Sequence, residues 1–466
     1  MTPTTPMSGF RRRAVLVSAT AAIGALSLVL TGCADTGSAG ASSSSSTKSS
    51  LPAALVAAGT KEAKAISGGK KIGGTVKVVG TLTGQEKSDF LAALQPFEDV
   101  TGITVDYTGT EAYTTLVQTG VDSGNPPDVI NLGNLAMVQK YASEGKLVSI
   151  DKAVGKSTMS ANFDSGLLDS TSYKGTNYGI WTQLDTYGIW YNAKTYSGPT
   201  TGSWADLTKW TTKEAAAGTT PWCIGLSSGA TTGWPGAYMI LNNLLKESGP
   251  GVVNALSDGT GTWDSPEVKA AFESFGDIAT SSKMVAGGGA GALSADQATS
   301  GNGMFANPQK CSLMDWGEWS GSSLLSADSK LKAVKDVNYF SVPYGNKAYA
   351  NDEGITGTFT SAFTDTPAVR AYLKYVASVP AQNLTAATGN WIAASKGVSA
   401  TSYPNELFKS MAKNIIATKH LTTLPVTVID PTVKSALYTA VANYVQDPST
   451  LDTGLKAIDA AQAKLK

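Results

Sequence analysis

The sequence predicts an α/β protein organised as two lobes that are connected by hinge crossings. Between residues 75 and 144, three strand-like segments each precede a helical one, and a stretch richer in helices follows. Strands that alternate with helices favour a parallel sheet covered by helices on both faces. A later strand-like segment leads out of the helical region. The chain therefore builds one lobe, crosses to a second and returns, which is the usual plan of a hinged protein.

The first lobe is predicted from alternation and helical periodicity. "TVKVV", "ITVDYTG" and "PPDVINLG" have the residue pattern of strands. "EKSDFLAALQPFEDVTG" places four large apolar side chains on one helical face, and Gly102 ends this helix. Two further helices are expected at Glu111–Val121 and Asn134–Glu144. Such sheets bind ligands at the carboxyl ends of their strands, so we expect contacts near Thr81–Gln85 and Leu132–Asn134.

The second lobe begins after "YGIWTQLDTYGIWYN" and is mostly helical. In "SWADLTKWTTKEAAAG", Ser203 and Asp206 have the spacing of a capping pair. Leu207 and Trp210 face inward, and Gly218 closes this helix. Further helices are expected at Gly236–Glu247, Pro266–Thr280 and Pro367–Ser378, and a strand at Val337–Gly345.

The N-terminus has the features of an export signal. Arg11, Arg12 and Arg13 precede an apolar run, Ala14–Leu30, which is short for a membrane span. Small residues then lead to Cys33, and "LTGC" resembles the bacterial lipobox, in which the cysteine is acylated and becomes the N-terminus. An ordinary secretory signal with a chance cysteine is the alternative. The "RRAVL" sequence leaves both the general and the twin-arginine export routes open.

Residues 1–32 are therefore predicted to be a lipoprotein signal peptide, and residues 33–70 a flexible tether rich in Ser, Ala and Gly. The Ser-rich part of this tether, Asp35–Ser50, cannot bury apolar surface. Roughly 400 residues remain, enough for two domains that each have a core. Removal of the leader takes away three arginines and no acidic residue, so the net charge becomes about −3. No basic stripe is present, and nucleic-acid binding is not expected.

Two further cysteines follow the leader, Cys223 and Cys311. An even pair in an oxidising compartment is most simply a disulfide, and closing a loop of about 90 residues would stabilise the fold by about 4 kcal/mol. A zinc site is the alternative, but it needs three or four ligands and the chain has one histidine. The residues therefore favour the disulfide, and no metal or cofactor is predicted.

Several motifs resemble one known family. "PWCIGLSSGATTGWPGAYMILNNLLKESGP", "MFANPQKC" and "FTDTPAVRAYLKYVAS" look like segments of the α-glucoside-type branch of the extracellular solute-binding proteins, family 1, which serve bacterial ABC sugar importers. The order of "DVINLG", "GIWYNAKTY", "SWADL", "VNYFSVP" and "GNWIAASKG" is also similar to the general plan of maltose-type binding proteins. The resemblance covers residues 73–466.

This resemblance implies a two-lobed periplasmic-binding-protein-like fold of type II, the maltose-binding-protein-like type. The family also joins its two cysteines. The N-terminal lobe is expected at residues 71–184 plus 346–392, and the C-terminal lobe at 185–345 plus 393–466. Hinge crossings are expected near Asp185–Trp190, Tyr344–Thr356 and Gly389–Ser395.

The resemblance also indicates ligand-binding residues. Aromatic side chains cover the apolar faces of a pyranose, and polar groups bind its hydroxyls. Asp185 lies where maltose-type proteins use a carboxylate on sugar hydroxyls, with a turn or hinge cap as the alternative. Trp234 lies where the family has an aromatic near the ligand, with core packing as the alternative.

Trp316, Glu318 and Trp319 follow the second disulfide cysteine and form either a sugar platform or an edge packed on the second lobe. Here the sequence departs from the α-glucoside branch, which is more basic after this cysteine, so the sugar preference is left open. The remaining candidates lie at strand ends or near lobe crossings: Gln85, Asn134, Gln183, Asn390 and Trp391.

The function implied is that of a monomeric, lipid-anchored binding protein on the outer face of the cell membrane. It would capture a sugar or oligosaccharide, an α-glucoside among the options, and deliver it to the membrane permease subunits of an ABC importer. A carbohydrate-sensing or adhesive surface lipoprotein of the same fold is one alternative, and a glycoside hydrolase is another. The adjacent Asp352 and Glu353 would point to opposite faces of a strand, however, and make a poor catalytic pair. We therefore predict no enzymatic activity.

Overall fold

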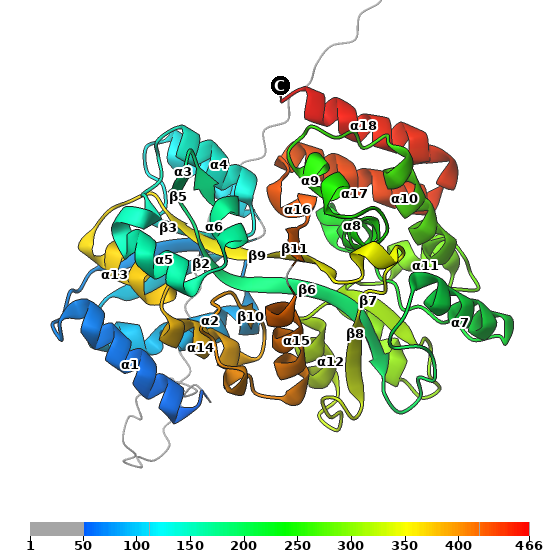
Figure 1. Ribbon diagram of the computed structural model, residues 1–466, viewed down its shortest axis with the longest axis horizontal. Coiled ribbons are helices and arrows are strands. Elements are labelled where there is room, and N and C mark those ends of the chain that lie inside the picture. Colours follow the sequence, from blue (N-terminus) through cyan, green and yellow to red (C-terminus); the bar gives the residue numbers. More distant parts are fainter. Residues whose placement is uncertain (1–50, 111, 419, 466) are drawn as a thin grey trace, which may run out of the picture. The chain divides into compact units, whose positions relative to one another are not determined.

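The computed structural model describes residues 51–110, 112–418 and 420–465 (Figure 1). Its first three strands form the parallel sheet that the sequence predicts. β1 (Thr75–Gly80) lies between β2 (Thr104–Gly109) and β3 (Val129–Leu132) and pairs with both in parallel. The helices that follow these strands are α2 (Gly84–Thr101), α3 (Tyr113–Asp122) and α4 (Leu135–Ser143). Gly102 ends α2 in the left-handed region at φ 67°, as expected for a helix C-terminus.

Two long strands connect this parallel sheet to the rest of the chain. β6 (Ile180–Asn192) and β9 (Asp352–Ala362) pair in antiparallel orientation, the first residues of β6 with the middle of β9. The last residues of β9 also pair with β3, while the last residues of β6 pair with β7 (Leu313–Gly317) and β8 (Val337–Ser341). Figure 1 shows β6 and β9 running side by side from one half to the other. Both strands therefore belong to both halves of the protein, the half that contains the parallel sheet and the half that contains β7 and β8.

The described residues form a sheet of nine strands in the order β10-β6-β9-β3-β1-β2, with β11 added on β9 and β7 and β8 on β6. β10 (Ile392–Ala393) pairs with Leu184 and Gln183 of β6, and β11 (His420–Thr423) runs parallel to the start of β9. The three predicted crossings therefore fall on or beside β6, β9 and β10. The exact lobe boundaries and the movement of the lobes stay predictions.

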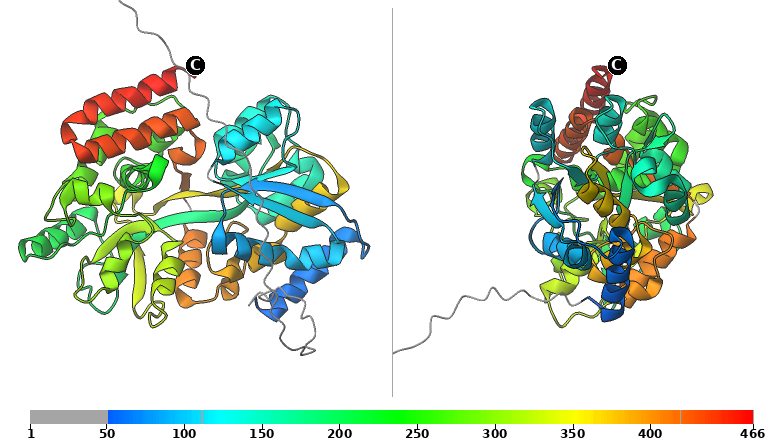
Figure 2. Two further views of the ribbon diagram at one scale, coloured as in Figure 1. Left: turned by 180° about the vertical axis from the view of Figure 1, so that it is seen from behind. Right: turned by 90° about the vertical axis from the view of Figure 1, so that its left-hand side faces the viewer.

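The second half has its own apolar core, formed mainly by helices. Its buried side chains include Trp263, Phe272, Phe275, Leu437 and Val441. The helices that enclose it are α7 (Trp204–Ala216), α8 (Trp234–Ser248), α9 (Pro250–Ser257), α10 (Pro266–Ala279), α11 (Gly288–Ser294), α16 (Pro425–Val428), α17 (Pro431–Gln446) and α18 (Leu451–Ala463). α17 and α18 lie side by side in both views (Figures 1 and 2).

The other apolar core contains side chains of the parallel sheet and also of β6, β7 and β8. Its helices include α13 (Pro367–Val376), α14 (Val379–Thr388), α12 (Ser320–Ala327) and α15 (Glu406–Ala417). The short elements that complete this part are η1 (Asp151–Gly155), α5 (Lys156–Asn162), α6 (Ser165–Ser170), β4 (Ser172–Tyr173) and β5 (Thr176–Asn177). The α/β class and the type II two-lobed fold are thus confirmed.

Local sequence patterns predict the structure correctly where interactions between nearby residues determine it. The Ser203 hydroxyl accepts the Asp206 amide, and the Asp206 carboxylate accepts the Ser203 amide at 3.0 Å, so α7 begins with the predicted capping box. Leu207 is buried, whereas Trp210 is half-buried against the second core. Cys223 and Cys311 form the predicted disulfide, with their Cα atoms 5.4 Å apart.

The prediction of a flexible tether over residues 33–70 is wrong in its last part. Ala53–Ser67 form the helix α1, which packs against α2, α13 and α14. This segment is rich in alanine, which has the highest helix propensity of all residues, so it forms a helix although its composition resembles that of a linker. Gly59 allows the close contact, because a Cβ there would lie 2.7 Å from Leu384 Cδ1. Residues 33–50 lie outside the described residues.

The predicted signal peptide, residues 1–32, and the lipidation site Cys33 also lie outside the described residues. Among the residues that are described, the search for membrane-spanning helices finds none of sufficient length and apolar character.

Candidate functional site

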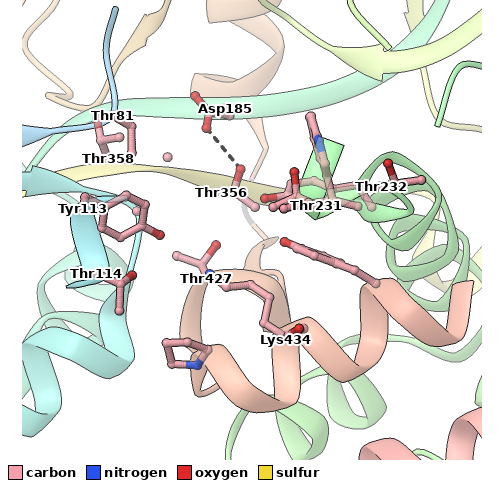
Figure 3. Close-up of a pocket in the computed structure, with 18 of the residues that line it drawn as sticks. Thr81, Tyr113, Thr114, Asp185, Thr231, Thr232, Thr356, Thr358, Thr427 and Lys434 are labelled. Atoms are coloured by element: carbon pink, nitrogen blue, oxygen red, sulfur yellow. Dashed lines mark hydrogen bonds between the residues drawn. The ribbon is translucent and has the colours of Figure 1, made fainter. Parts of the chain in front are cut away.

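A cavity of about 480 Å³ opens between elements of the two halves. Thr81 after β1, Tyr113 and Thr114 of α3, and Gly133 after β3 line one side. Residues of the turn before α8, of α8 itself, of α16 and of α17 line the other side. β6 and β9 form its floor. Figure 3 shows Tyr113 and Thr114 facing Thr231, Thr232 and Lys434 across this space.

The first side of the cavity is where a parallel sheet places its ligands. β1 and β3 are parallel neighbours, so their carboxyl ends meet at the same edge, and Thr81 and Gly133 directly follow these ends. Two predicted residues of these loops do not line the cavity. Gln85 is exposed, and its amide donates to Asp89 Oδ1 at 2.8 Å. Asn134 is buried and caps α4, accepting the Met137 amide at 3.1 Å.

The floor carries a short chain of hydrogen bonds that ends on a carboxylate. Asp185 of β6 lies opposite Thr356 of β9, and Thr356 Oγ1 donates to Asp185 Oδ2 at 3.2 Å (Figure 3). The Tyr187 hydroxyl lies 2.9 Å from Thr356 Oγ1. Because Thr356 donates its proton to Asp185, Tyr187 donates to Thr356. Asp185 is half-buried, and burial raises the pKa of its carboxyl to about 6.

Aromatic side chains of α8 line the second side. Trp234 and Tyr238, four residues apart on one helical face, both border the cavity and contact each other at 5.2 Å between ring centroids. Trp316 packs against Trp234 at 4.9 Å and is 5% exposed, and the half-buried Trp319 lies 6.4 Å from Trp234. Trp234 therefore faces the cavity, and Trp316 and Trp319 support it outside the lining.

The other predicted site residues lie away from this cavity. Glu318 is 1% exposed and lies beneath Asp185, where its Oε2 accepts the Thr186 amide at 2.9 Å. Gln183 and Trp391 are buried beside β10 and β6. The Asn390 side chain donates to Asp89 Oδ2 at 2.6 Å. Of the ten predicted residues, the structure brings Asp185 and Trp234 together at the cavity and places Glu318, Trp316 and Trp319 directly behind them.

Sequence reasoning missed the contribution of α17. Lys434 and Tyr438 lie four residues apart on its cavity-facing side. The Lys434 ammonium donates to the Val426 carbonyl at 3.1 Å, and burial lowers its pKa to about 8. Among the lining residues, Lys434 is the one cation and Asp185 the one carboxylate. The available signal was the pattern in "DPTVKSALY", a lysine and a tyrosine at helical spacing after an Asp-Pro helix start.

The lining groups suit a small molecule with many hydroxyls. Threonine and tyrosine hydroxyls can donate or accept, Asp185 accepts, and Lys434 donates. Trp234, Tyr238 and Tyr113 offer aromatic surface to an apolar face of the ligand. Metal ligands do not gather in the described residues, since no group of three or more His, Cys, Asp or Glu side chains occurs there in a suitable arrangement.

Two halves, the strands that join them and a polar, aromatic cavity between them define a receptor for a small solute. A model of the family described as "Bacterial extracellular solute-binding protein" matches residues 81–383. The chain belongs to this family.

Two curated relatives agree with this assignment, and a solved structure has a similar fold. The "Osmoprotective compounds-binding protein GgtB" of Synechocystis is 29% identical over 72% of this chain and 80% of the relative. The "Alpha-glucosides-binding periplasmic protein AglE" of Rhizobium meliloti is 26% identical over 74% of this chain and 77% of the relative. A solved "Chitin oligosaccharide binding protein" has a similar fold, with a TM-score of 0.69, 21% identity, and coverage of 84% of this chain and 98% of that chain.

Proposed function

We propose that this protein captures a sugar or oligosaccharide by closure of its two halves and delivers it unaltered to the membrane subunits of an ABC importer. The observation that carries the proposal is the cavity itself, which has lining residues from both halves and a floor made of the two strands that connect them. A ligand held on one side completes its contacts when the other side approaches, so binding favours the closed form.

The lining chemistry supports a sugar. A pyranose has apolar C–H faces that stack on aromatic rings, and Trp234 and Tyr238 supply such rings on one wall. Asp185 can accept hydrogen bonds from sugar hydroxyls, and each unmet buried hydroxyl would cost about 1–3 kcal/mol, which gives the cavity its selectivity. The names of the two curated relatives, one for α-glucosides and one for osmoprotective compounds, support an α-glucoside as the first ligand to test.

The carboxylates argue for binding without hydrolysis. Glycoside hydrolysis uses two carboxyl groups on either side of the scissile bond. Asp185 is the one carboxylate among the residues that line the cavity, and the Glu353 carboxylate pairs instead with Lys246 at 3.1 Å. The bound glycoside would therefore leave the cavity intact.

We also propose that Cys33 carries the lipid that holds the protein as a monomer on the outer face of the cell membrane. Attachment near the importer raises the effective concentration of the loaded protein at the permease. Mass spectrometry of the wild type should find an N-terminus at an acylated Cys33, and Cys33→Ser in the full chain should carry no acyl group. An unmodified Cys33 in the wild type would contradict lipidation.

A panel of glycans screened by thermal shift tests the main proposal. A true ligand raises the melting temperature by mass action, because it binds the native state alone. The panel contains maltose, trehalose, sucrose, raffinose and chitobiose, and chromatography of the recovered glycan shows whether it was altered. We expect at least one glycan to stabilise the protein and to be recovered intact. A sensing or adhesive lipoprotein would bind glycan without supporting its uptake by the cell, and a hydrolase would release products.

A further inference from the structure

Glu318 is an acidic residue that the cavity does not use directly. It lies in the turn between β7 and α12, is 1% exposed, and is bound to β6 through both its backbone amide and its side chain. Its amide donates to the Thr186 carbonyl at 3.0 Å, and its Oε2 accepts the Thr186 amide at 2.9 Å. These contacts hold the carboxyl group next to Asp185, the residue that precedes Thr186 on β6, and the two carboxyl groups are within hydrogen-bonding reach of each other.

One oxygen of Glu318 has no donor. Oε1 is fully buried and has no hydrogen-bond partner when the carboxyl group is ionised. Oε2 is occupied by the Thr186 amide, so Oε1 is the oxygen left to meet Asp185. Two carboxylates this close cannot both be ionised at low cost, and a buried charge without a partner is strongly disfavoured. A proton on Glu318 Oε1 removes both problems, because the acid then donates to the Asp185 carboxylate.

We propose that Glu318 is a positioning residue for the ligand-binding carboxylate, held as a neutral acid that donates a hydrogen bond to Asp185 and so orients Asp185 toward the cavity. The proposal rests on the proposed function, because it assigns Asp185 to the ligand. In this arrangement Asp185 accepts from Thr356 and from Glu318, and its remaining lone pairs are directed to a sugar hydroxyl. The role of Glu318 is therefore that of a fixed proton donor behind the site.

The surroundings of the pair retain this proton. The one outside group that raises the pKa of Asp185 by its charge is Glu86 of α2. The nearby tyrosines, Tyr187 of β6, Tyr238 of α8 and Tyr403 before α15, have raised pKa values themselves because they are buried and because the two carboxyls lie close to them, so they are neutral at pH 7 and supply no positive charge. Lys434 borders the same cavity on α17, where it donates to a backbone carbonyl. Burial and the neighbouring Asp185 raise the pKa of Glu318 well above its ordinary value. The proton is consequently retained at neutral pH.

Glu318→Gln and Glu318→Leu separate this role from simple packing. Glutamine reproduces the protonated acid, because its carbonyl oxygen can accept the Thr186 amide while its NH₂ group donates to Asp185. Leucine has a similar size and fills the space, but it donates nothing. A residue that only fills volume would tolerate leucine at least as well as glutamine.

The experiment uses full-length protein and two measurements. Infrared spectra of the ligand-free wild type and of E318Q at about pH 7 report a protonated carboxyl group through its carbonyl band. Calorimetry with maltose and trehalose as probes then compares the affinities of the three proteins. We expect a carboxylic acid band in the wild type that loses the contribution of one group in E318Q, while the contribution of the buried Asp315 remains in both proteins. We also expect E318Q to bind within about threefold of the wild type and E318L to bind at least about tenfold more weakly.

The two arms fail separately. An acid band of equal intensity in the wild type and E318Q overturns the proposal whatever the protein binds, even if neither probe binds and the proposed function fails. A band that decreases in E318Q, together with full affinity in E318L or with equal losses of affinity in E318Q and E318L, overturns the positioning role while leaving sugar binding intact. If E318L does not fold, Thr356→Val takes its place in the comparison, because this variant removes the other donor to Asp185. E318Q should then bind the probes more tightly than T356V.

Discussion

Asp185 and Thr356 face each other on β6 and β9, and the hydrogen bond from Thr356 Oγ1 to Asp185 Oδ2 at 3.2 Å joins the two strands at the cavity floor. This cavity-lining carboxylate is therefore part of the connection between the two halves. A contact made there by a ligand acts directly on the strands that any closing movement must bend.

Asp185→Asn should weaken sugar binding by about tenfold or more without unfolding the protein. The amide keeps the size of the side chain but loses the charge that strengthens a hydrogen bond from a sugar hydroxyl. Calorimetry with the glycan selected by the thermal-shift panel measures the loss. Asp106→Asn is the matched control, because Asp106 is exposed on β2 outside the cavity and should bind normally. Equal affinities for D185N and the wild type would remove Asp185 from the site.

The affinity of the wild type for this glycan should fall at acidic pH. Burial raises the pKa of Asp185 to about 6, and a protonated carboxyl no longer accepts as a charged group. We expect affinity to weaken by up to about tenfold per pH unit below this pKa, relative to about pH 7. The weakening should be absent from D185N, whose side chain does not titrate. A wild-type affinity that is constant down to about pH 4.5 would contradict the assignment.

Trp234→Ala should also reduce sugar affinity by about tenfold, because it removes the aromatic surface of one cavity wall. Trp234→Phe keeps part of that surface and should lose less. Trp210→Phe is the control, since Trp210 lies half-buried on α7 away from the cavity. The change in tryptophan fluorescence on adding sugar should largely disappear in W234F and persist in W210F. The reverse pattern would place the ligand elsewhere.

Much of the fold could be predicted because local chemistry specifies it. The β1–β3 alternation, the glycine at the end of α2 and the Ser203–Asp206 capping box are short-range signals, and the structure contains each. The pairing of Asp185 with Thr356 joins positions 171 residues apart, and the sequence indicates the crossings only through a family resemblance. Long-range pairing of this kind is set by the whole fold.

The candidate site was predicted less completely for a related reason. Trp234, Trp316 and Trp319 are chemically alike, and their packing decides that Trp234 faces the cavity while the other two lie behind it. Lys434 and Tyr438 belong to a helix near the C-terminus, and no local pattern reveals that this helix lines the cavity. The helix α1 was not predicted because its Ala-rich segment has the composition of a linker, although alanine also has a high helix propensity.

Asp315→Asn should stabilise the protein at alkaline pH. Asp315 on β7 is 3% exposed, its Oδ2 has no hydrogen-bond partner, and burial raises its pKa to about 7. The native state therefore binds more protons than the unfolded chain between about pH 4 and pH 7, so the free energy of unfolding falls as pH rises through this window. Urea unfolding at about pH 5 and pH 8 should show a loss of about 2 kcal/mol in the wild type that D315N lacks. Parallel losses in both proteins would show that Asp315 does not titrate in this range.

Gly357→Ala should disrupt the floor where the two strands cross. Gly357 has φ 149° and borders the cavity between Thr356 and Thr358. A Cβ at this position would lie 2.3 Å from the Gln183 carbonyl oxygen, beside the register shift in β6, so the backbone of one strand must move. Such backbone strain costs about 1–3 kcal/mol.

The loss in G357A should appear both in the free energy of unfolding and in sugar affinity, because displacement of β6 also moves Asp185. Gly251→Ala on α9 is the control: a Cβ there meets nothing within 4 Å, and alanine is the better helix former. G251A should therefore be at least as stable as the wild type and bind sugar equally well. If G357A kept full stability and affinity, the contact between β6 and β9 at Gly357 would be looser than in the structure. The cavity floor could then not transmit ligand binding to the two halves.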